Sequence, residues 1–466
     1  MIVVFERFDV PGLSQYSYIV GDGGVVAVID PKRDIDTYLD YADSKGLRIG
    51  YVLETHIHAD FASGARALAD ASGAELCLSG HDEGETYSYA FAHKKLRDGD
   101  ELVLGKLTLG TMHTPGHTPE HISFLLSEPD RSGEPLALFS GDFLFVGSVG
   151  RPDLLGEAEK QELAKALYRS VQNLAALPDG TMVFPGHGAG SLCGAGMAQR
   201  EQSTLGYERA TNPFLKKQTE QTFVDTVLST VPEFPDYYRR MKKLNSAGPP
   251  FLRQLPGGEH LEVKQFEEKL KDTSAILLDL RRPEAFGGAH IPGSINIGAG
   301  PNLSMWAAWV LSYDQPILLV GDANTDMEAA RRSLIRVGLD TVVGSLRGGI
   351  SVWLESGRDQ GHVPQISVRE LQAVLGGSSK ATLLDVRSPG EWKIGHIESA
   401  IHIPGGDLRE HIKDVPADKA LYVICGSGYR SSVAASVLAH SGRRQLTNVD
   451  GGMSAWKNQN LPVVEV

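Results

Sequence analysis

The stretch YVLETHIHADF, residues 51–61, is the most informative segment of the N-terminal half: a short apolar run opens directly into a histidine-rich loop. Three later stretches follow a similar pattern, namely TPGHT at 114–118, SGD at 140–142 and FPGHG at 184–188. Loops at strand ends carry much of the chemistry of sheet proteins. Because imidazoles and a carboxylate from such loops can converge on one ion, these stretches together predict a metal site.

The pattern of apolar runs around these motifs predicts sheets covered by helices. The predicted strands are residues 18–20, 25–29, 51–54, 76–78, 102–104, 122–126, 136–140 and 181–184, and the predicted helix is 157–174. Outside the four motifs, single histidines are expected to be surface or core residues; these are His81, His93, His113 and His121.

An internal repeat occupies the second half of the chain. LLDLRRPEAFGGAHIPGSINI at 277–297 aligns with LLDVRSPGEWKIGHIESAIHI at 383–403, and SLRGGISVW at 345–353 aligns with NVDGGMSAW at 448–456. Units of about 100 residues are too long for a solenoid repeat, so we predict two tandem domains of one fold. We call residues 260–358 the first copy and residues 366–464 the second copy.

The apolar runs of the copies lack polar alternation and are separated by helical patterns, which favours buried parallel sheets. The predicted strands are 275–280 and 317–320 in the first copy and 382–386 and 421–424 in the second, with helices at 326–337 and 430–441. Pro- and Gly-containing linkers at 246–260 and 361–365 separate the parts. The predicted domains are therefore residues 1–245, 260–358 and 366–464.

Length and charge restrict the possible functions. A chain of 466 residues suggests about three domains. With 45 Lys and Arg against 58 Asp and Glu, the net charge of −13 argues against a nucleic-acid partner. No apolar run approaches the roughly 18 residues of a membrane span, and the first residues, MIVVFERFDV, lack the pattern of a signal peptide, so we expect a cytoplasmic protein.

The three cysteines cannot form a disulfide framework, so each is judged by its context. Cys77 lies in a strand-like run and is expected only to pack. Cys193 follows His187 by six residues in a Gly-rich segment, and it is either a small buried residue or, as the resemblance to the persulfide dioxygenase branch described below implies, a group that accepts or positions a persulfide sulfur.

Cys425 ends an apolar strand and begins the loop CGSGYR, residues 425–430, which runs into a helix. Backbone N–H groups, the helix N-terminus and the guanidinium of Arg430 all favour negative charge on a sulfur held there. We predict that Cys425 and Arg430 are catalytic. The loop residues expected to surround the bound sulfur are Gly426, Ser427, Gly428 and Tyr429.

The ordered histidine and aspartate motifs resemble the metallo-β-lactamase superfamily over about the first 240 residues. That resemblance implies an αββα fold. The superfamily signature is HxHxDH, but here the first motif reads His56-x-His58-x-Asp60-Phe61. Because phenylalanine replaces an imidazole that helps to hold a second metal, we expect one metal per chain.

Within the superfamily, THIHADFASG at 55–64, PGHT at 115–118 and GDFLFVGSVGRPDL at 141–154 resemble the persulfide dioxygenase branch. The resemblance implies one Fe(II) bound by His56, His117 and Asp142, a donor set that leaves coordination positions open. It also implies three residues that lie near the metal without binding it: His58, Asp60 and His187. Arg151 is expected to pair either with a substrate anion or with Asp153.

Both copies resemble the rhodanese sulfurtransferase family, which implies α/β domains with parallel sheets. The second copy carries the DVR segment at 385–387, the loop from Cys425 to Arg430 and GGMSAW at 451–456. In the first copy Gly321 replaces the cysteine and Asp326 the arginine, so we expect it to be catalytically inactive and structural.

These resemblances together predict an enzyme that oxidises a low-molecular-weight persulfide with O2 and water to sulfite and thiol, coupled to sulfur transfer that can form thiosulfate. The alternative is a glyoxalase II-like thioester hydrolase with a sulfurtransferase appendage, and a third possibility is a non-enzymatic sulfur carrier. The expected partners are the persulfide, O2, sulfite and thiosulfate, with no nucleic acid and no membrane. A homodimer or homotetramer is expected, and the thiol of the persulfide is left open.

Overall fold

The structure is a computed structural model that describes residues 4–231, 235–377, 381–416 and 419–465. The chain divides into two compact units: the first holds residues up to 253 together with 335–338, and the second holds the remaining residues from 254 onward. Among the described residues, no helix is long and apolar enough to cross a membrane.

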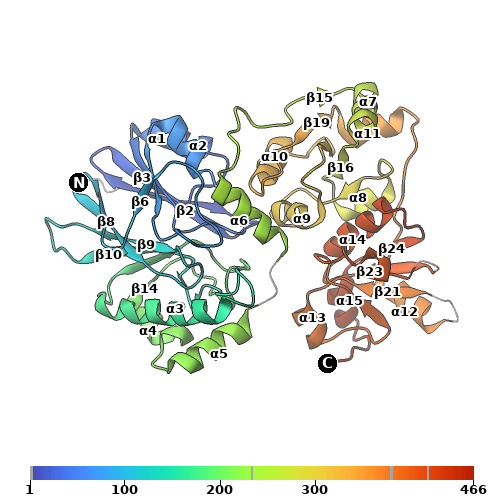
Figure 1. Ribbon diagram of the computed structural model, residues 1–466. Helices are drawn as coiled ribbons and strands as arrows, with labels where there is room; N and C mark the ends of the chain where they lie inside the picture. The colour runs from blue at the N-terminus through green and yellow to red at the C-terminus, as the bar shows by residue number, and fades with distance from the viewer. Residues whose placement is uncertain (1–3, 232–234, 378–380, 417–418, 466) are drawn as a thin grey trace. The chain divides into compact units, whose positions relative to one another are not determined.

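The first unit contains two six-stranded sheets (Figure 1). The first sheet consists of β1 (Val4–Val10), β2 (Gln15–Asp22), β3 (Val25–Ile29), β4 (Arg48–Leu53), β5 (Glu75–Ser79) and β6 (Lys94–Leu96). The second sheet, in spatial order, consists of β14 (Ser203–Thr204), β13 (Met182–Pro185), β10 (Pro135–Gly141), β9 (Ile122–Ser127), β8 (Leu107–His113) and β7 (Glu101–Leu104). A small hairpin, β11 (Leu144–Phe145) and β12 (Ser148–Val149), follows β10.

The two sheets bury one core between them, because apolar side chains from both sheets belong to the same buried cluster. Tyr18 and Val20 of β2 and Ala27 of β3 pack there with Phe124 of β9 and Phe139 of β10. Strand β3, VVAVI, has no polar residue and is covered on both faces, which explains why its bounds match the predicted strand at 25–29.

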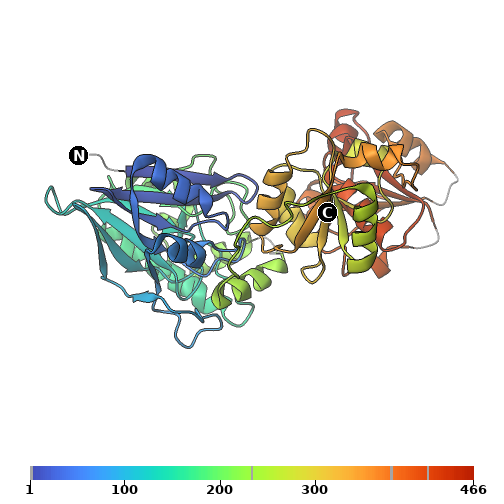
Figure 2. The same ribbon diagram turned by 90° about the horizontal axis from the view of Figure 1, so that it is seen from above.

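Helices cover the outer face of each sheet (Figure 1). Helices α1 (Asp36–Lys45) and α2 (Ala65–Ser72) pack on the first sheet. Figure 2 shows these two blue helices from above. Helices α3 (Lys160–Asn173) and α5 (Glu220–Thr230) pack on the second sheet. The αββα arrangement is therefore confirmed, and α4 (Leu205–Thr211) and α6 (Tyr237–Ala247) complete the unit.

The second unit holds two five-stranded sheets, and every strand pair in both is parallel. In spatial order, the sheet of the first copy is β15 (His260–Leu261), β19 (Val342–Leu346), β18 (Ile317–Val320), β16 (Ile276–Asp279) and β17 (Ile295–Asn296). That of the second copy is β20 (Gln365–Ile366), β24 (Leu446–Val449), β23 (Leu421–Ile424), β21 (Thr382–Asp385) and β22 (Ala400–His402).

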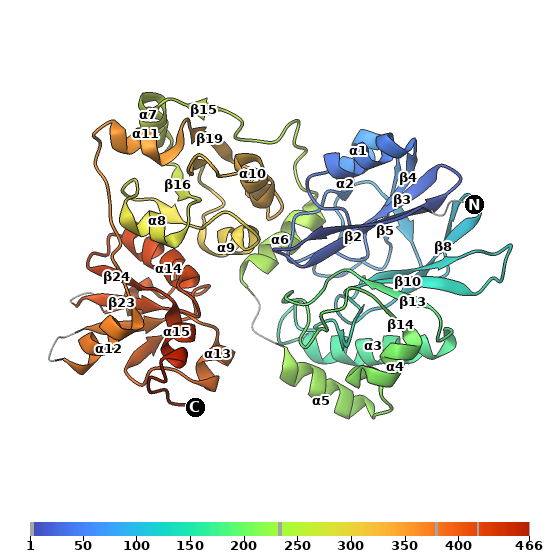
Figure 3. The same ribbon diagram turned by 180° about the vertical axis from the view of Figure 1, so that it is seen from behind.

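The two sheets share one strand order, so the repeat predicted from the sequence folds as two α/β layers of one kind. The helices of the first copy are α7 (Val263–Thr273), α8 (Pro283–Gly288), α9 (Leu303–Val310), α10 (Met327–Ile335) and α11 (Gly349–Glu355). Those of the second are α12 (Val368–Gly376), α13 (Pro389–Ile394), α14 (Tyr429–His440) and α15 (Gly452–Asn458). Seen from behind, α14 runs beside the first copy (Figure 3), and it contacts β17 and α8 there.

Candidate metal centre and sulfur site

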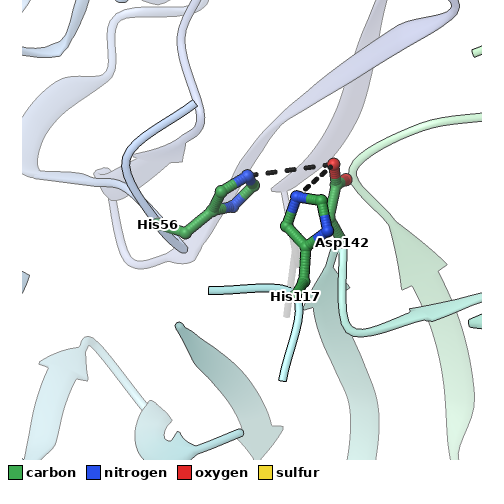
Figure 4. A group of neighbouring side chains, drawn as sticks. All are labelled: His56, His117 and Asp142. Carbon is green, nitrogen blue, oxygen red and sulfur yellow. Dashed lines mark ion pairs between the residues drawn. The ribbon is translucent and has the colours of Figure 1, made fainter. Parts of the chain in front are cut away.

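The three predicted metal ligands converge in the αββα unit. His56 lies in the loop after β4, His117 lies in the loop between β8 and β9, and Asp142 directly follows β10. The Nε2 atoms of His56 and His117 lie 3.8 Å and 3.5 Å from Oδ2 of Asp142 (Figure 4). The three donor atoms all lie within 4.8 Å of one another, so one cation could contact them all.

The three facing atoms have no hydrogen-bond partner among the described residues. All three side chains are buried, and an unsatisfied buried polar atom costs about 1–3 kcal/mol. Burial also lowers the pKa of both His56 and His117 well below the usual histidine value, which keeps the imidazoles neutral. Neutral imidazole nitrogens and a bare carboxylate oxygen are the donors that a metal ion needs, so these residues fit a metal.

The rest of each ligand is held by hydrogen bonds that leave the facing atom free. Nδ1 of His117 donates to the carbonyl of Arg151 at 2.9 Å, so its Nε2 presents a lone pair. Nδ1 of His56 lies 2.9 Å from Oγ1 of Thr55. Oδ1 of Asp142 is 2.7 Å from Nδ1 of His187, which leaves Oδ2 for the cation.

His58 lies next to the triad of His56, His117 and Asp142, but its hydrogen bond goes to a residue outside the triad. Nε2 of His58 is 3.0 Å from Oδ1 of Asp30, which raises the pKa of His58 although burial opposes the shift. The ring of Phe61, the residue that replaces the signature histidine, lies 4.4 Å from the His58 ring.

Asp60 and His187 form a buried chain with Asp142. Nε2 of His187 is 2.7 Å from Oδ2 of Asp60, and its Nδ1 is the atom that meets Asp142. Burial alone would lower the pKa of His187, but the two carboxylates outweigh it and raise that pKa well above the usual value. Asp60 and His187 are thus engaged with each other, and their place near the metal without binding it stays a prediction.

Cys193 lies at this centre, as its position after His187 suggested. Its sulfur joins Asp60 and His187 in a second group of donor atoms within 4.8 Å of one another, so the count of one metal also stays a prediction. The thiol is buried, and burial, followed by the charges of Asp60 and Asp142, raises its pKa well above the usual value. The hydroxyl of Tyr238, on α6, is 4.0 Å from the sulfur.

Arg151 supports the loop that carries Cys193. Its guanidinium is buried, pairs with Asp153 through bonds of 2.7 Å and 2.8 Å, and donates to the carbonyl of Leu192. The pairing with Asp153, one of the two alternatives for Arg151, is therefore present. Substrate binding by Arg151 stays a prediction.

Sequence reasoning missed several residues that hold the histidine loop in place. Asp30 follows β3 and accepts from both the backbone N–H and the hydroxyl of Thr55. His121, expected to be a surface or core residue, is buried, and its Nε2 accepts from the backbone N–H of Asp142 at 3.1 Å. Asp30 could have been found, because it repeats the pattern of a carboxylate directly after a buried strand.

Helix α6 contributes two buried polar residues that the sequence pattern did not predict. Nζ of Lys242 donates to the carbonyl of Ile57 at 3.0 Å, and burial lowers the pKa of Lys242. The amide of Asn245 donates to the carbonyls of His58 and Phe61, both at 2.8 Å. These bonds fix the histidine loop from a segment more than 180 positions away.

The second candidate site surrounds Cys425 in the second copy. Cys425 directly follows β23 and is fully buried. Its sulfur accepts from the backbone N–H of Gly428 at 3.1 Å and from the hydroxyl of Ser431 at 3.3 Å. Gly428 has φ +107°, a conformation that suits glycine, and it lets the loop curl around the sulfur ahead of α14.

Arg430 lies between Cys425 and a carboxylate on α13. Its two terminal nitrogens each donate to Glu391 at 2.6 Å, and this pairing, with a smaller contribution from the Cys425 sulfur, raises the pKa of Arg430. Although partial burial opposes it, Arg430 holds the pKa of Glu391 at about 2. A cavity of about 190 Å³, lined in part by Glu391, Gly426 and Ser454, opens beside the loop.

The equivalent loop of the first copy is occupied differently. A Cβ atom at Gly321 would lie 2.5 Å from Oγ1 of Thr325, so a cysteine could replace this glycine only if neighbouring side chains moved. Asp326 accepts from the backbone N–H of Ala329 at 2.9 Å and thus caps α10. Both features support the prediction that the first copy has no sulfurtransferase activity.

Comparisons with known proteins agree with this architecture. Residues 10–187 match the metallo-beta-lactamase superfamily, and residues 262–356 and 367–459 each match the rhodanese-like domain. A crystal structure of a metallo-beta-lactamase from Staphylococcus aureus is 38% identical, covers 74% of this chain and 99% of that chain, and has a TM-score of 0.66.

Curated relatives match mainly the first half of the chain. A hydroxyacylglutathione hydrolase of Methylococcus capsulatus is 30% identical over 49% of this chain and 94% of that protein. The mitochondrial persulfide dioxygenase ETHE1 of Bos taurus is 29% identical over 47% of this chain and 78% of that protein. A beta-lactamase hydrolase-like protein of Agrobacterium fabrum is 30% identical over 47% of this chain, and the match spans only 54% of its length. The chain therefore belongs to the metallo-beta-lactamase superfamily and carries two rhodanese-like domains.

Proposed function

We propose that the chain is an Fe(II)-dependent persulfide dioxygenase joined to a sulfurtransferase. The observation that carries this proposal is the triad of His56, His117 and Asp142, whose facing atoms are buried and unpartnered. Two imidazoles and one carboxylate are the donor set of many non-haem iron oxygenases. The similarity to the Bos taurus persulfide dioxygenase supports this assignment.

The overall reaction at this centre is RSSH + O2 + H2O → RSH + HSO3⁻ + H⁺, in which the outer sulfur is oxidised and dioxygen is reduced. Bound Fe(II) supplies the redox chemistry by which O2 reacts with sulfur. The protein's part is to hold the triad away from solvent, with His187 fixing the orientation of Asp142. Cys193, whose sulfur belongs to the same group of donor atoms as Asp60 and His187, would position the persulfide.

At Cys425 the proposed step is transfer of one sulfane sulfur. The thiolate of Cys425 first takes the outer sulfur of a persulfide RSSH, whose S–S bond breaks as RSH leaves. The persulfide formed on Cys425 then reacts with sulfite, its S–S bond breaks, and thiosulfate leaves while Cys425 regains its thiolate. The N–H of Gly428 and the hydroxyl of Ser431 contact Sγ and would stabilise this thiolate. Sulfur flow in the opposite direction, with Cys425 loading a thiol carrier for oxidation, uses the same contacts.

A second candidate is a thioester hydrolase, which the similarity to hydroxyacylglutathione hydrolase favours. The group formed by Asp60, His187 and Cys193 offers donors for a second cation, and metal-activated water would then be the nucleophile. A location in the cytoplasm and a homo-oligomeric state are proposed with either function.

Metal analysis combined with gas uptake separates the two candidates. The protein is reconstituted anaerobically with Fe(II), and iron and zinc are counted per chain before O2 uptake and sulfite are measured with several persulfides. One iron per chain with persulfide-dependent O2 uptake is expected. Two zinc ions per chain with thioester cleavage and no O2 uptake would overturn the proposal in favour of hydrolysis.

A further inference from the structure

The inactive first copy contacts the helix that carries the sulfur loop of the second copy. Strand β17 lies at the edge of the first copy's sheet, and α14 packs against it. The backbone N–H of Asn296 donates to Oγ of Ser436 at 2.9 Å, and Oγ of Ser432 donates to Oδ1 of Asn296 at 2.9 Å. All three residues are buried, so water does not compete for these bonds.

Asn296 is itself anchored to the first copy. Its side-chain N–H groups donate to the carbonyls of Asp279 and Arg281, at 3.1 Å and 2.8 Å. With these bonds and the one from Ser432, both ends of the Asn296 amide are satisfied. The side chain therefore connects the end of β16 directly to Ser432 of α14.

A second contact lies at the first turn of α14. The hydroxyl of Tyr429, the first residue of the helix, donates to the carbonyl of Gly298 at 3.3 Å. The segment 296–298 of the first copy therefore bonds to α14 at two successive turns. Ser431, one of the two donors to the Cys425 sulfur, lies between these contacts in the helix.

The two copies carry different residues at the position of Asn296, and the difference provides the contact with Ser432. In the alignment of 277–297 with 383–403, Asn296 corresponds to His402 and Arg281 to Arg387. Nε2 of His402 bonds to the carbonyl of Arg387 at 2.8 Å, as the Asn296 amide bonds to that of Arg281. Asn296 keeps this bond and adds an acceptor oxygen for Ser432.

We propose that Asn296 is a positioning residue for sulfur transfer: it fixes α14 so that Gly428 and Ser431 point their donors at the Cys425 sulfur. The first copy, which has lost its own cysteine, then acts as part of the sulfurtransferase site. This inference rests on the proposed sulfur transfer, and it assigns to the first copy a role that a spacer would not have.

The test measures the Cys425 thiol directly in the full-length protein. The Asn296→Ala, Ser432→Ala and double variants are alkylated with iodoacetamide at neutral pH, the rate at Cys425 is followed by mass spectrometry, and thiosulfate formation is assayed in parallel. Both single variants are expected to slow alkylation severalfold and transfer about tenfold, because small displacements of reacting groups are costly. The double variant should be no slower than Asn296→Ala, since the bond that Ser432→Ala removes is already lost in Asn296→Ala.

Ser304→Ala is the matched control. Ser304 is a buried serine of the first copy that donates to the carbonyl of Ser333 and does not bond to α14, so its loss should lower thermal stability without slowing alkylation. Folded Asn296→Ala and Ser432→Ala proteins with wild-type alkylation and transfer rates would overturn the inference. If Asn296→Ala fails to fold, the helix-compatible Ser432→Ala decides the question alone. Alkylation needs no sulfur acceptor, so a failure of the proposed activity is distinguished from a failure of this inference.

Discussion

Oδ2 of Asp60 and Nε2 of His187 lie 2.7 Å apart in a fully buried pair, and the other nitrogen of His187 lies 2.7 Å from Asp142. Asp60 thereby fixes the imidazole that orients the carboxylate of the candidate metal centre. Without Asp60, His187 could rotate and leave both oxygens of Asp142 free.

Removing the charge of Asp60 should weaken the metal site without destroying it. Loss of a residue that orients a metal ligand typically costs about 10- to 100-fold in affinity or activity. We expect the Asp60→Asn protein to bind Fe(II) about 10- to 100-fold more weakly than the wild type, as measured by competition with a chelator. Asp153→Asn, a change in the buried pair with Arg151 outside the triad, serves as the comparison. Unchanged iron affinity in Asp60→Asn would show that the pair does not support the centre.

The triad and its neighbour His58 should respond differently to substitution. Asp142→Ala should abolish both iron retention and O2 uptake, because it removes the only carboxylate of the triad. His58→Gln should retain iron, because His58 is not one of the three converging donors and its Nε2 bonds to Asp30. Iron content by elemental analysis checks both variants, and continued uptake in Asp142→Ala would remove that residue from the ligand set.

Substitution of Cys425 should separate the two activities. Cys425→Ser is expected to consume O2 at the wild-type rate with a persulfide substrate, and to release sulfite without thiosulfate. Chromatographic analysis of the products measures this ratio. Cys77→Ser is the control, since Cys77 packs in the core of the first unit. Thiosulfate from the Cys425→Ser protein would place sulfur transfer elsewhere in the chain.

Cys193 should matter for oxidation and not for sulfur transfer. If its thiol positions the persulfide beside the triad, Cys193→Ser lowers O2 uptake by about tenfold or more with a low-molecular-weight persulfide. Transfer of sulfur from thiosulfate by Cys425 should be unaffected. An oxygen-uptake rate equal to that of the wild type would reduce Cys193 to a buried packing residue.

The ion pair between Glu391 and Arg430 predicts a pH dependence of stability. In the folded protein the pKa of Glu391 is about 2, below the usual value of 4.5, so the pair stabilises the fold above about pH 4.5. This contribution is lost as the pH falls from 4.5 towards 2. Chemical denaturation should therefore show a difference in the free energy of unfolding between the wild-type and Glu391→Gln proteins. This difference should be constant near neutral pH and should disappear at acidic pH. A difference in the free energy of unfolding that persists at low pH would contradict a stabilising ion pair between Glu391 and Arg430.

The sequence was sufficient to predict those candidate site residues that come shortly after a strand. His56, Asp142 and Cys425 each follow an apolar run, and the structure places each directly after, or a few residues beyond, a buried strand. The predicted strands at 317–320 and 421–424 coincide with β18 and β23, because short runs without polar residues have few other ways to bury themselves.

The supporting residues could not be predicted in the same way. Lys242 and Asn245 belong to α6, whose sequence YYRRMKKLNSA resembles a solvated basic helix, and only tertiary contact buries them under the histidine loop. The domain limits chosen from linker composition remain predictions. The contact between Asn296 and α14 could not be predicted either, because a strand of two residues is too short to show a hydrophobic pattern.

The packing of α14 on β17 has a consequence for protein engineering. A rhodanese-like segment cut out at the linker before residue 365 would expose Ser432 and Ser436, and the rest of the chain would keep an uncovered sheet edge that invites aggregation. The two rhodanese-like domains are best transplanted, truncated or evolved as one piece, because each covers buried groups of the other.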